Sequence, residues 1–357
     1  MRVSSQASSF AENELSRLAI VAALLLSLSS CSGPPDEKKW GELMGAGENA
    51  FRQQKLDEAQ NYFQQALSEA EKFGPDNFRI AGTLNDLALI PSAKKDFAKA
   101  AELSQRALAI DEKVHGPEHL DVAYDLNNTG TYLDFLGQHQ KATPLLERSL
   151  KIRRKLLGEN DPLVAVTTGN LGENYASLKR NVDAESQFFV VRQIWRNNKR
   201  PAEYFVATDQ LAQFYLKTGQ GKKAEILLKQ SIQSEAQAGA PAEIILAYKR
   251  KIADYYMQAK QYAQAEKILV SVVNDLRVMG GANDLNMAQT MNTIAVALSK
   301  QKKYAQAEPY MKSAIQIVEN SPASNQTPLL LKNYADILNK MGRKKEAAAV
   351  LKRASGG

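Results

Sequence analysis

The residues that most readily do chemistry are few in this chain of 357 residues, which holds one cysteine and three histidines. Two of the histidines, His115 and His119, lie in the stretch VHGPEH with Glu118 beside them. A metal ion would need further ligands at the same point, and the spacing places none there. We therefore predict no metal site, and we expect His119 to cap the helix that follows it.

Motifs for catalysis are missing from the sequence as well. It has no G-x-S-x-G nucleophile elbow, and the glycine-containing stretches GTGTYLDFLG and MGGAND lack the GK[ST] of a phosphate-binding loop. The carboxylates are scattered over the surfaces of predicted helices. These observations predict no catalytic residues, no cofactor and no enzymatic activity.

The single cysteine, Cys31, directly follows the apolar run Leu18–Leu28 and two serines. Arg17 stands before this run, so the order matches that of a secretory signal. The tetrapeptide LSSC that ends at Cys31 resembles the lipobox of bacterial lipoproteins, in which the chain is cut before the cysteine and its sulfur is lipidated. The resemblance implies a signal peptide over residues 1–30, followed by a lipidated Cys31 and a flexible tether over 31–39.

Lipidation would fix the location of the protein. A cysteine thiolate is a strong nucleophile, and two or more acyl chains hold a protein stably on a membrane. In enteric lipoproteins an aspartate after the cysteine retains the protein at the inner membrane, whereas Ser32 stands there in this chain. The resemblance thus favours a periplasm-facing protein of the outer membrane. The alternative is a cytoplasmic regulator, if the signal interpretation is wrong.

From Trp40 onward the chain repeats a unit of 40 to 42 residues. Each repeat is marked by one alanine, and these marker alanines are Ala59, Ala100, Ala142, Ala184, Ala224, Ala265, Ala307 and Ala347. Twelve residues before each marker stands another small residue: Gly47, Ala88, Gly130, Gly172, Ala212, Ala253, Ala295 or Ala335. Larger apolar residues flank both positions at helical spacing. Two small residues per repeat would let two helix axes approach closely.

A single hairpin of this kind cannot bury its own apolar faces, whereas stacked hairpins share a continuous core. The repeat therefore predicts an all-α solenoid of about eight helix-turn-helix units over residues 40–354, with a short tail over 355–357. The last helix, residues 344–353, has no following helix to cover it. We expect its AAAV stretch to leave an apolar surface on which a second copy of the chain could pair.

The repeat pattern resembles the tetratricopeptide repeat. One unit shows the typical order, with the small Ala253, an aromatic Tyr256 three residues later, the marker Ala265 and then Leu269. The usual period is about 34 residues, and the longer period here is similar to the kinesin-light-chain type. The resemblance implies a right-handed superhelix whose concave groove, lined by the first helix of each unit, binds a protein or peptide.

In that family the groove residues lie three before and one and four after the small residue of the first helix. Carried onto this chain, the positions three before give Asn85, Asn127, Arg250 and Asn292, and those one after give Thr131 and Gln213. Asparagine both donates and accepts hydrogen bonds, which suits the backbone of an extended peptide. The alternative is that these asparagines are polar residues of the fold without a ligand.

Charge is unevenly distributed along the chain. Residues 31–190 hold 19 Lys and Arg against 24 Asp and Glu, whereas residues 191–357 hold 25 against 13. A candidate basic patch consists of Lys249, Arg250, Lys251, Lys302 and Lys303. It offers an alternative function, the binding of an anionic envelope polymer or lipid surface. Nucleic acid is not an expected partner, because aromatic residues do not interleave with these clusters.

Three prolines lie inside predicted helices. Pro144 and Pro309 each follow a marker alanine by two residues. We expect both in the first turn of the second helix of a unit, where proline costs no hydrogen bond. Pro91 lies near the end of a first helix, and we expect it to shorten or distort that helix.

Overall fold

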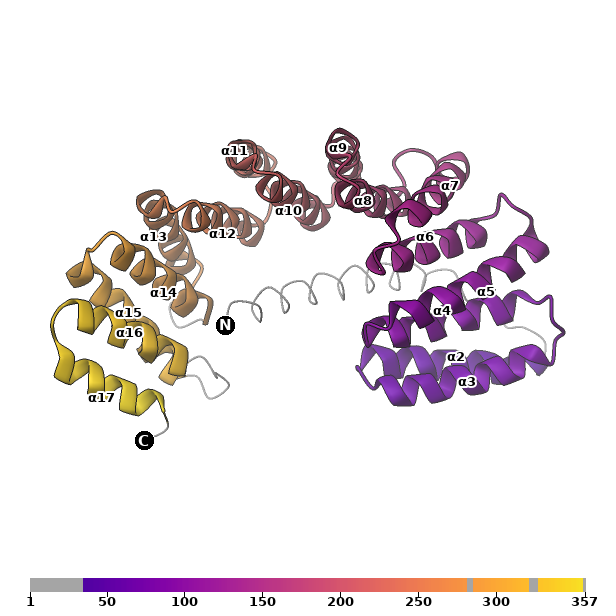
Figure 1. The fold of residues 1–357 in the computed structure, drawn as a ribbon, viewed down its shortest axis with the longest axis horizontal. Coiled ribbons are helices and arrows are strands. Elements are labelled where there is room, and N and C mark those ends of the chain that lie inside the picture. The colour runs from indigo at the N-terminus through magenta and orange to yellow at the C-terminus, as the bar shows by residue number, and fades with distance from the viewer. Residues whose placement is uncertain (1–34, 281–284, 321–326, 356–357) are drawn as a thin grey trace. The chain divides into compact units, whose positions relative to one another are not determined.

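The structure is a computed structural model that describes residues 35–280, 285–320 and 327–355. Within these ranges every regular element is an α-helix, and first (A) and second (B) helices of hairpins alternate along the chain (Figure 1). The A helices are α2 (Pro35–Arg52), α4 (Phe78–Ala93), α6 (Leu120–Phe135), α8 (Pro162–Ser177), α10 (Pro201–Lys217), α12 (Ala242–Gln258), α14 (Leu285–Lys300) and α16 (Thr327–Lys340). The B helices are α3 (Leu56–Glu71), α5 (Phe97–His115), α7 (His139–Leu157), α9 (Asn181–Asn197), α11 (Gly221–Gln237), α13 (Tyr262–Val278), α15 (Tyr304–Glu319) and α17 (Lys344–Ala354). The predicted α-solenoid of helix-turn-helix units is confirmed.

The helices form two compact units, which divide between Arg200 and Pro201. Unit 1 holds α2 to α9 and unit 2 holds α10 to α17, and within each unit every helix packs against the next one along the chain. A helices of successive hairpins also contact each other directly, α2 with α4 and α6 with α8 in unit 1, and α10 with α12 and α14 with α16 in unit 2. We call the surface formed by the A helices of a unit its A face.

The small residues of the repeat lie where each A helix crosses its B helix. All eight marker alanines are at most 1% exposed, and the Gly or Ala twelve residues earlier is buried in every hairpin. A Cβ atom added to Gly47 would lie 2.6 Å from Cδ1 of Phe63, and one added to Gly130 would lie 2.8 Å from Cγ of Leu146. A larger side chain of the B helix therefore occupies the space that the glycine leaves.

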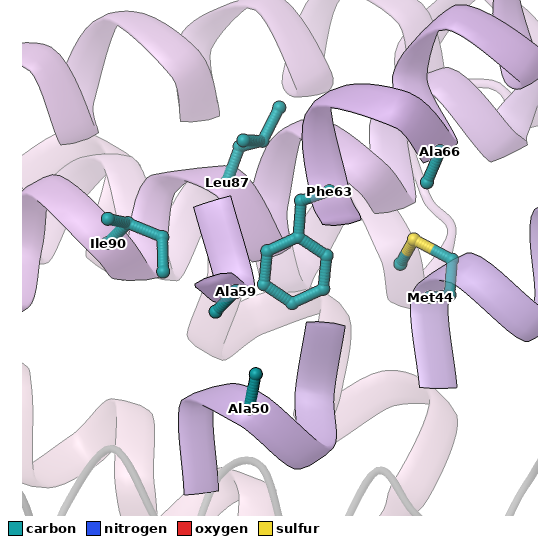
Figure 2. Packing of buried hydrophobic residues seen from close by; sticks show 7 residues of the cluster. All are labelled: Met44, Ala50, Ala59, Phe63, Ala66, Leu87 and Ile90. Atoms are coloured by element: carbon teal, nitrogen blue, oxygen red, sulfur yellow. The ribbon is translucent and has the colours of Figure 1, made fainter. Parts of the chain in front are cut away.

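Figure 2 shows this packing in the first hairpin. The ring of Phe63, from α3, lies in a cluster with Met44 and Ala50 of α2 and Ala59 of α3. Leu87 and Ile90 of α4 join the same cluster, so the core continues from one hairpin into the next. Continuity of this kind is what buries the apolar faces of a solenoid.

Each turn between an A and a B helix has the same backbone geometry. The residue five before the marker has a positive φ in every hairpin, and these residues are Gln54, Lys95, Gly137, Lys179, Gly219, Lys260, Lys302 and Gly342. The N–H of the next residue bonds back across the turn, as from Asp96 to the Pro91 carbonyl at 2.8 Å and from Gln261 to the Tyr256 carbonyl at 2.8 Å. This is the Schellman arrangement that ends a helix on a left-handed residue.

The three internal prolines differ from expectation. Pro91 does not shorten its helix, because α4 continues to Ala93 and has the same 16 residues as α6. Pro144 and Pro309 are each the sixth residue of their helices, since α7 begins at His139 and α15 at Tyr304, so the prediction of a first-turn position is wrong. A proline beyond the first turn removes one backbone bond, and the buried faces of these helices offset that loss.

Most of the predicted amino-terminal features lie in residues that the structure does not describe. The signal peptide and Cys31 lie outside the described residues. Helix α2 begins at Pro35, so residues 35–39, which the sequence assigns to a tether, belong to the first A helix. None of the helices in the described ranges is both long and apolar enough to cross a bilayer.

Candidate functional site

On the A face, side chains of successive A helices are joined by a recurring polar contact. It links the residue three before the small residue of one hairpin to the residue two before the small residue of the next. In unit 1 the Asn170 side-chain amide donates to Oδ1 of Asn127 at 3.0 Å. In unit 2 Asn333 donates to Asn292 at 3.0 Å, and Lys251 pairs with Asp209 at 2.9 Å. These contacts fix the spacing of the A helices.

The second hairpin of unit 1 makes a different, buried contact to the next A helix, five residues before Gly130. Nδ2 of Asn85 donates to Oδ1 of Asp125 at 2.5 Å, and the two residues are only 5% and 0% exposed. Burial raises the pKa of Asp125 well above its usual range, and the Asp125 carboxyl is in turn hydrogen-bonded to Asp111. Asn85 is therefore held inside the stack of helices.

The predicted groove residues divide into two groups. Asn85 and Asn127 are buried and hold neighbouring A helices together, whereas Thr131, Gln213, Arg250 and Asn292 are half-buried on the A face. The Thr131 hydroxyl donates to the Asn127 carbonyl at 2.7 Å and accepts from Asn170 at 3.1 Å. The residues of the second group are thus the ones that a ligand could reach, and binding by any of them stays a prediction.

The sequence did not single out Asp86, a titratable residue two positions before the small Ala88. It is half-buried on α4. Burial, together with the nearby carboxylate of Glu48 on α2, raises the pKa of Asp86 to about 7. The signal that could have found this position is the repetition of polar residues there, because Asn128, Asn170 and Asn333 occupy it in other hairpins.

The comparison with protein families fits this geometry. A family model of the tetratricopeptide repeat matches residues 42–113, 79–155, 135–196, 243–320 and 286–356. Together these matches cover well over half of the chain. The chain belongs to the tetratricopeptide repeat family. Proteins with tetratricopeptide repeats (TPRs) are generally non-enzymatic scaffolds for protein interactions. The A helices are accordingly the first helices of TPR units.

Solved structures with TM-scores of 0.50 or more share this fold. A signal-transduction ATPase with a TPR sensor from Pyrococcus horikoshii is 17% identical with a TM-score of 0.56, over 95% of this chain and 51% of that one. The apo form of RapI is 16% identical with a TM-score of 0.50, over 75% and 99%. TPR-like repeats of a kinesin light chain from Podosopora anserina are 22% identical with a TM-score of 0.49, over 58% and 98%. A search of curated proteins finds no match.

Most charges of the predicted basic patch have acidic partners within unit 2. Lys249 pairs with Asp275 at 2.5 Å, and Lys303 pairs with Glu266 at 3.3 Å. Lys251 belongs to the contact with Asp209 described above. Arg250 donates to the side chain of Asn286 at 3.4 Å, and Lys302 is the left-handed residue of a TPR turn. The positive charge at these residues is therefore largely compensated.

The histidines have local partners in unit 1. Nδ1 of His119 accepts the backbone N–H of Asp121 at 3.3 Å, so His119 caps α6 as predicted. Nδ1 of His139 lies 2.7 Å from Asp134. The spacing of residues in the sequence did not predict that Asp111 and Asp121 approach His115. Asp111 comes from the preceding turn of α5, and Asp121 comes from the start of α6.

Proposed function

We propose that this TPR protein is a membrane-anchored scaffold that binds an extended segment of a partner protein on its A faces. The family supports the coarser part, because TPR proteins are generally scaffolds for protein interactions. The lipobox-like LSSC supports the anchor on Cys31. A scaffold tethered in this way would raise the concentration of its partner at the envelope membrane.

The main support for the A face as the binding surface is the recurring contact between A helices. Because Asn127 with Asn170, and Asn292 with Asn333, already join neighbouring helices, the half-buried side chains beside them stand on a fixed framework. A preorganised surface loses less conformational entropy on binding than a mobile one. Gln213 adds a donor and an acceptor that can pair with a peptide backbone.

The test is photo-crosslinking in cells with the full chain. A photoreactive amino acid at Gln213 on α10, on the A face of unit 2, should capture a discrete partner. The same amino acid at Gln230, which is exposed on the B helix α11, is the matched control and should capture far less. Adding Cys31→Ser should release the crosslinked complex from the membrane fraction.

Each part of the proposal can fail separately. Equal capture at Gln213 and Gln230 would contradict the A face as the binding surface. A Cys31→Ser chain that stays in the membrane fraction would contradict the lipid anchor and leave the binding surface standing.

A further inference from the structure

A cluster of metal-ligating side chains lies where the second hairpin of unit 1 meets the third. His115 is the last residue of α5, His119 caps α6, and Asp121 is the second residue of α6. One ligand atom from each of these three residues lies within 4.8 Å of the others. Nε2 of His115 is 3.6 Å from Oδ2 of Asp121, and Nδ1 of His119 is 3.2 Å from that same oxygen.

A fourth group, the carboxylate of Asp111, faces His115 from inside the protein. Asp111 lies one helical turn before His115 and is only 4% exposed. Its Oδ1 atom has no hydrogen-bond partner and lies 3.9 Å from Nε2 of His115, which is also buried without a partner. Buried polar atoms in folded proteins are almost always paired. These two facing, unpaired atoms are therefore available as ligands for a bound group.

The electrostatic surroundings indicate the charge of that group. Among the residues that the structure describes, the buried Asp111 and the exposed Asp121 have no Lys or Arg partner in an ion pair. Buried carboxylates are stabilised by a paired cation or a coordinated metal. A group bound between these carboxylates would therefore be a cation.

We propose that His115, His119 and Asp121, together with Asp111 beside His115, form a binding site for a divalent transition-metal ion of the zinc class. Two imidazole nitrogens and two carboxylate oxygens are ligands that Zn²⁺ accepts, whereas Mg²⁺ and Ca²⁺ prefer oxygen alone. Tetrahedral coordination with bonds of about 2.0–2.2 Å separates ligand atoms by about 3.4 Å. Three of the six separations between these ligand atoms are 3.2, 3.6 and 3.9 Å, which lie near that value.

Metal binding requires one local change. The rings of His115 and His119 are stacked, with centroids 4.3 Å apart and planes 14° apart, so their in-plane lone pairs do not meet at one point. The His119 side chain is 45% exposed and can turn toward the ion. Its bond to the Asp121 N–H is then exchanged for a metal bond.

Residues next to Asp111 help to position it. The Asp125 carboxyl is hydrogen-bonded to Asp111 and accepts in turn from Asn85 on α4. Hydrogen-bonded partners of this kind orient metal ligands. Because the ligands come from α5 and α6, a bound ion would tie the second TPR to the third.

The experiment is calorimetric titration of the full, chelator-treated chain with Zn²⁺, and separately with Mg²⁺. We expect one Zn²⁺ per chain at this site and at least 100-fold weaker binding of Mg²⁺. His115→Ala and Asp111→Asn should each weaken Zn²⁺ binding by at least tenfold. His119→Ser should weaken it too, and serine keeps a helix cap, so loss of binding there does not reflect loss of the fold. His139→Ala, outside the cluster, is the control and should bind like the original chain.

Cobalt gives a second measurement. Co²⁺ in a tetrahedral site absorbs in the visible range, and this absorption should be lost in His115→Ala but not in His139→Ala. Absence of Zn²⁺ binding by the original chain, or equal affinities of the His115→Ala and His139→Ala chains, would overturn the proposal.

Discussion

At the scale of single residues, the close approach of two helices depends on glycines that have no Cβ atom. Gly47 on α2 has no Cβ, and the ring of Phe63 fills that space. Gly45, two residues earlier on the same helix, is exposed and has no atom within 4 Å of an added Cβ. Glycine inside a helix costs roughly 0.5–1 kcal/mol relative to alanine. Of these two glycines, packing accounts for Gly47 but not for Gly45.

The two glycines give a matched pair of substitutions. Gly47→Ala should destabilise unit 1 by about 1–2 kcal/mol, because overpacking a core costs roughly 1–3 kcal/mol and outweighs the gain in helix propensity. Gly45→Ala should stabilise it by about 0.5–1 kcal/mol. Urea unfolding followed by circular dichroism measures both. Adding Phe63→Leu to Gly47→Ala should restore part of the loss, and equal effects of the two alanines would contradict the packing argument.

At the scale of elements, the eight TPR turns share a left-handed residue, but the sequence conceals it. Glycine, which adopts this conformation without strain, occupies the position at Gly137, Gly219 and Gly342, whereas lysine or glutamine occupies it elsewhere. The helices themselves were predictable, because small and apolar residues recur in phase. The turn residue was not, since the geometry is imposed by the two helices that it joins.

The candidate site shows the same limit of sequence reasoning. The positions on the A helices followed from the repeat, but the sequence could not separate Asn127, which holds two helices together, from Gln213, which stands half-exposed. That distinction depends on which side chain of the next A helix lies opposite. The approach of Asp111 to His115 was likewise hidden, because it depends on where α5 ends.

The turns yield a stabilising substitution. Lys260 has a φ of 58°, and its side chain is exposed. Lys260→Gly should raise the free energy of unfolding of unit 2 by about 1 kcal/mol, since a left-handed conformation costs roughly 1–2 kcal/mol for residues with a Cβ. Lys260→Ala is the control: it removes the charge but keeps the strain, so it should bring no such gain. The unfolding midpoint in urea distinguishes the two, and an equal rise in both would point to charge instead.

At the scale of the whole molecule, each unit holds a carboxyl with a strongly shifted pKa, which is raised at Asp86 in unit 1 and lowered at Glu308 in unit 2. In unit 1 burial raises the pKa of Asp86 to about 7. In unit 2 hydrogen bonds from Lys312 lower the pKa of Glu308 to about 2, with Tyr334 and Arg343 of the last hairpin also bonded to it at 2.9 and 2.7 Å. Hydrogen bonds from Lys229 likewise lower the pKa of Glu225 to about 2.

Asp86 and Glu308 are therefore expected to make opposite contributions to the pH dependence of their units. Folded Asp86 keeps a proton that the unfolded chain releases near its ordinary pKa of 3.8, so unit 1 should lose stability as pH rises from about 4 to 7. Glu308 stays ionised in the folded state below its ordinary pKa of 4.5. Its contribution to unit 2 is therefore complete above pH 4.5 and lost as pH falls toward 2.

Urea unfolding at a series of pH values, read by pulsed hydrogen exchange and mass spectrometry, assigns each transition to the peptides of its unit. Asp86→Asn should flatten the dependence of unit 1 between pH 4 and 7, and Glu308→Gln should reduce the acid sensitivity of unit 2 while lowering its stability at pH 7. Each substitution serves as the control for the other, because Asp86 lies in α4 and Glu308 in α15. If Asp86→Asn leaves the pH dependence of unit 1 unchanged, the proton it was assigned belongs to another group; if both units follow one common pH profile, their stabilities are not set by these carboxyls.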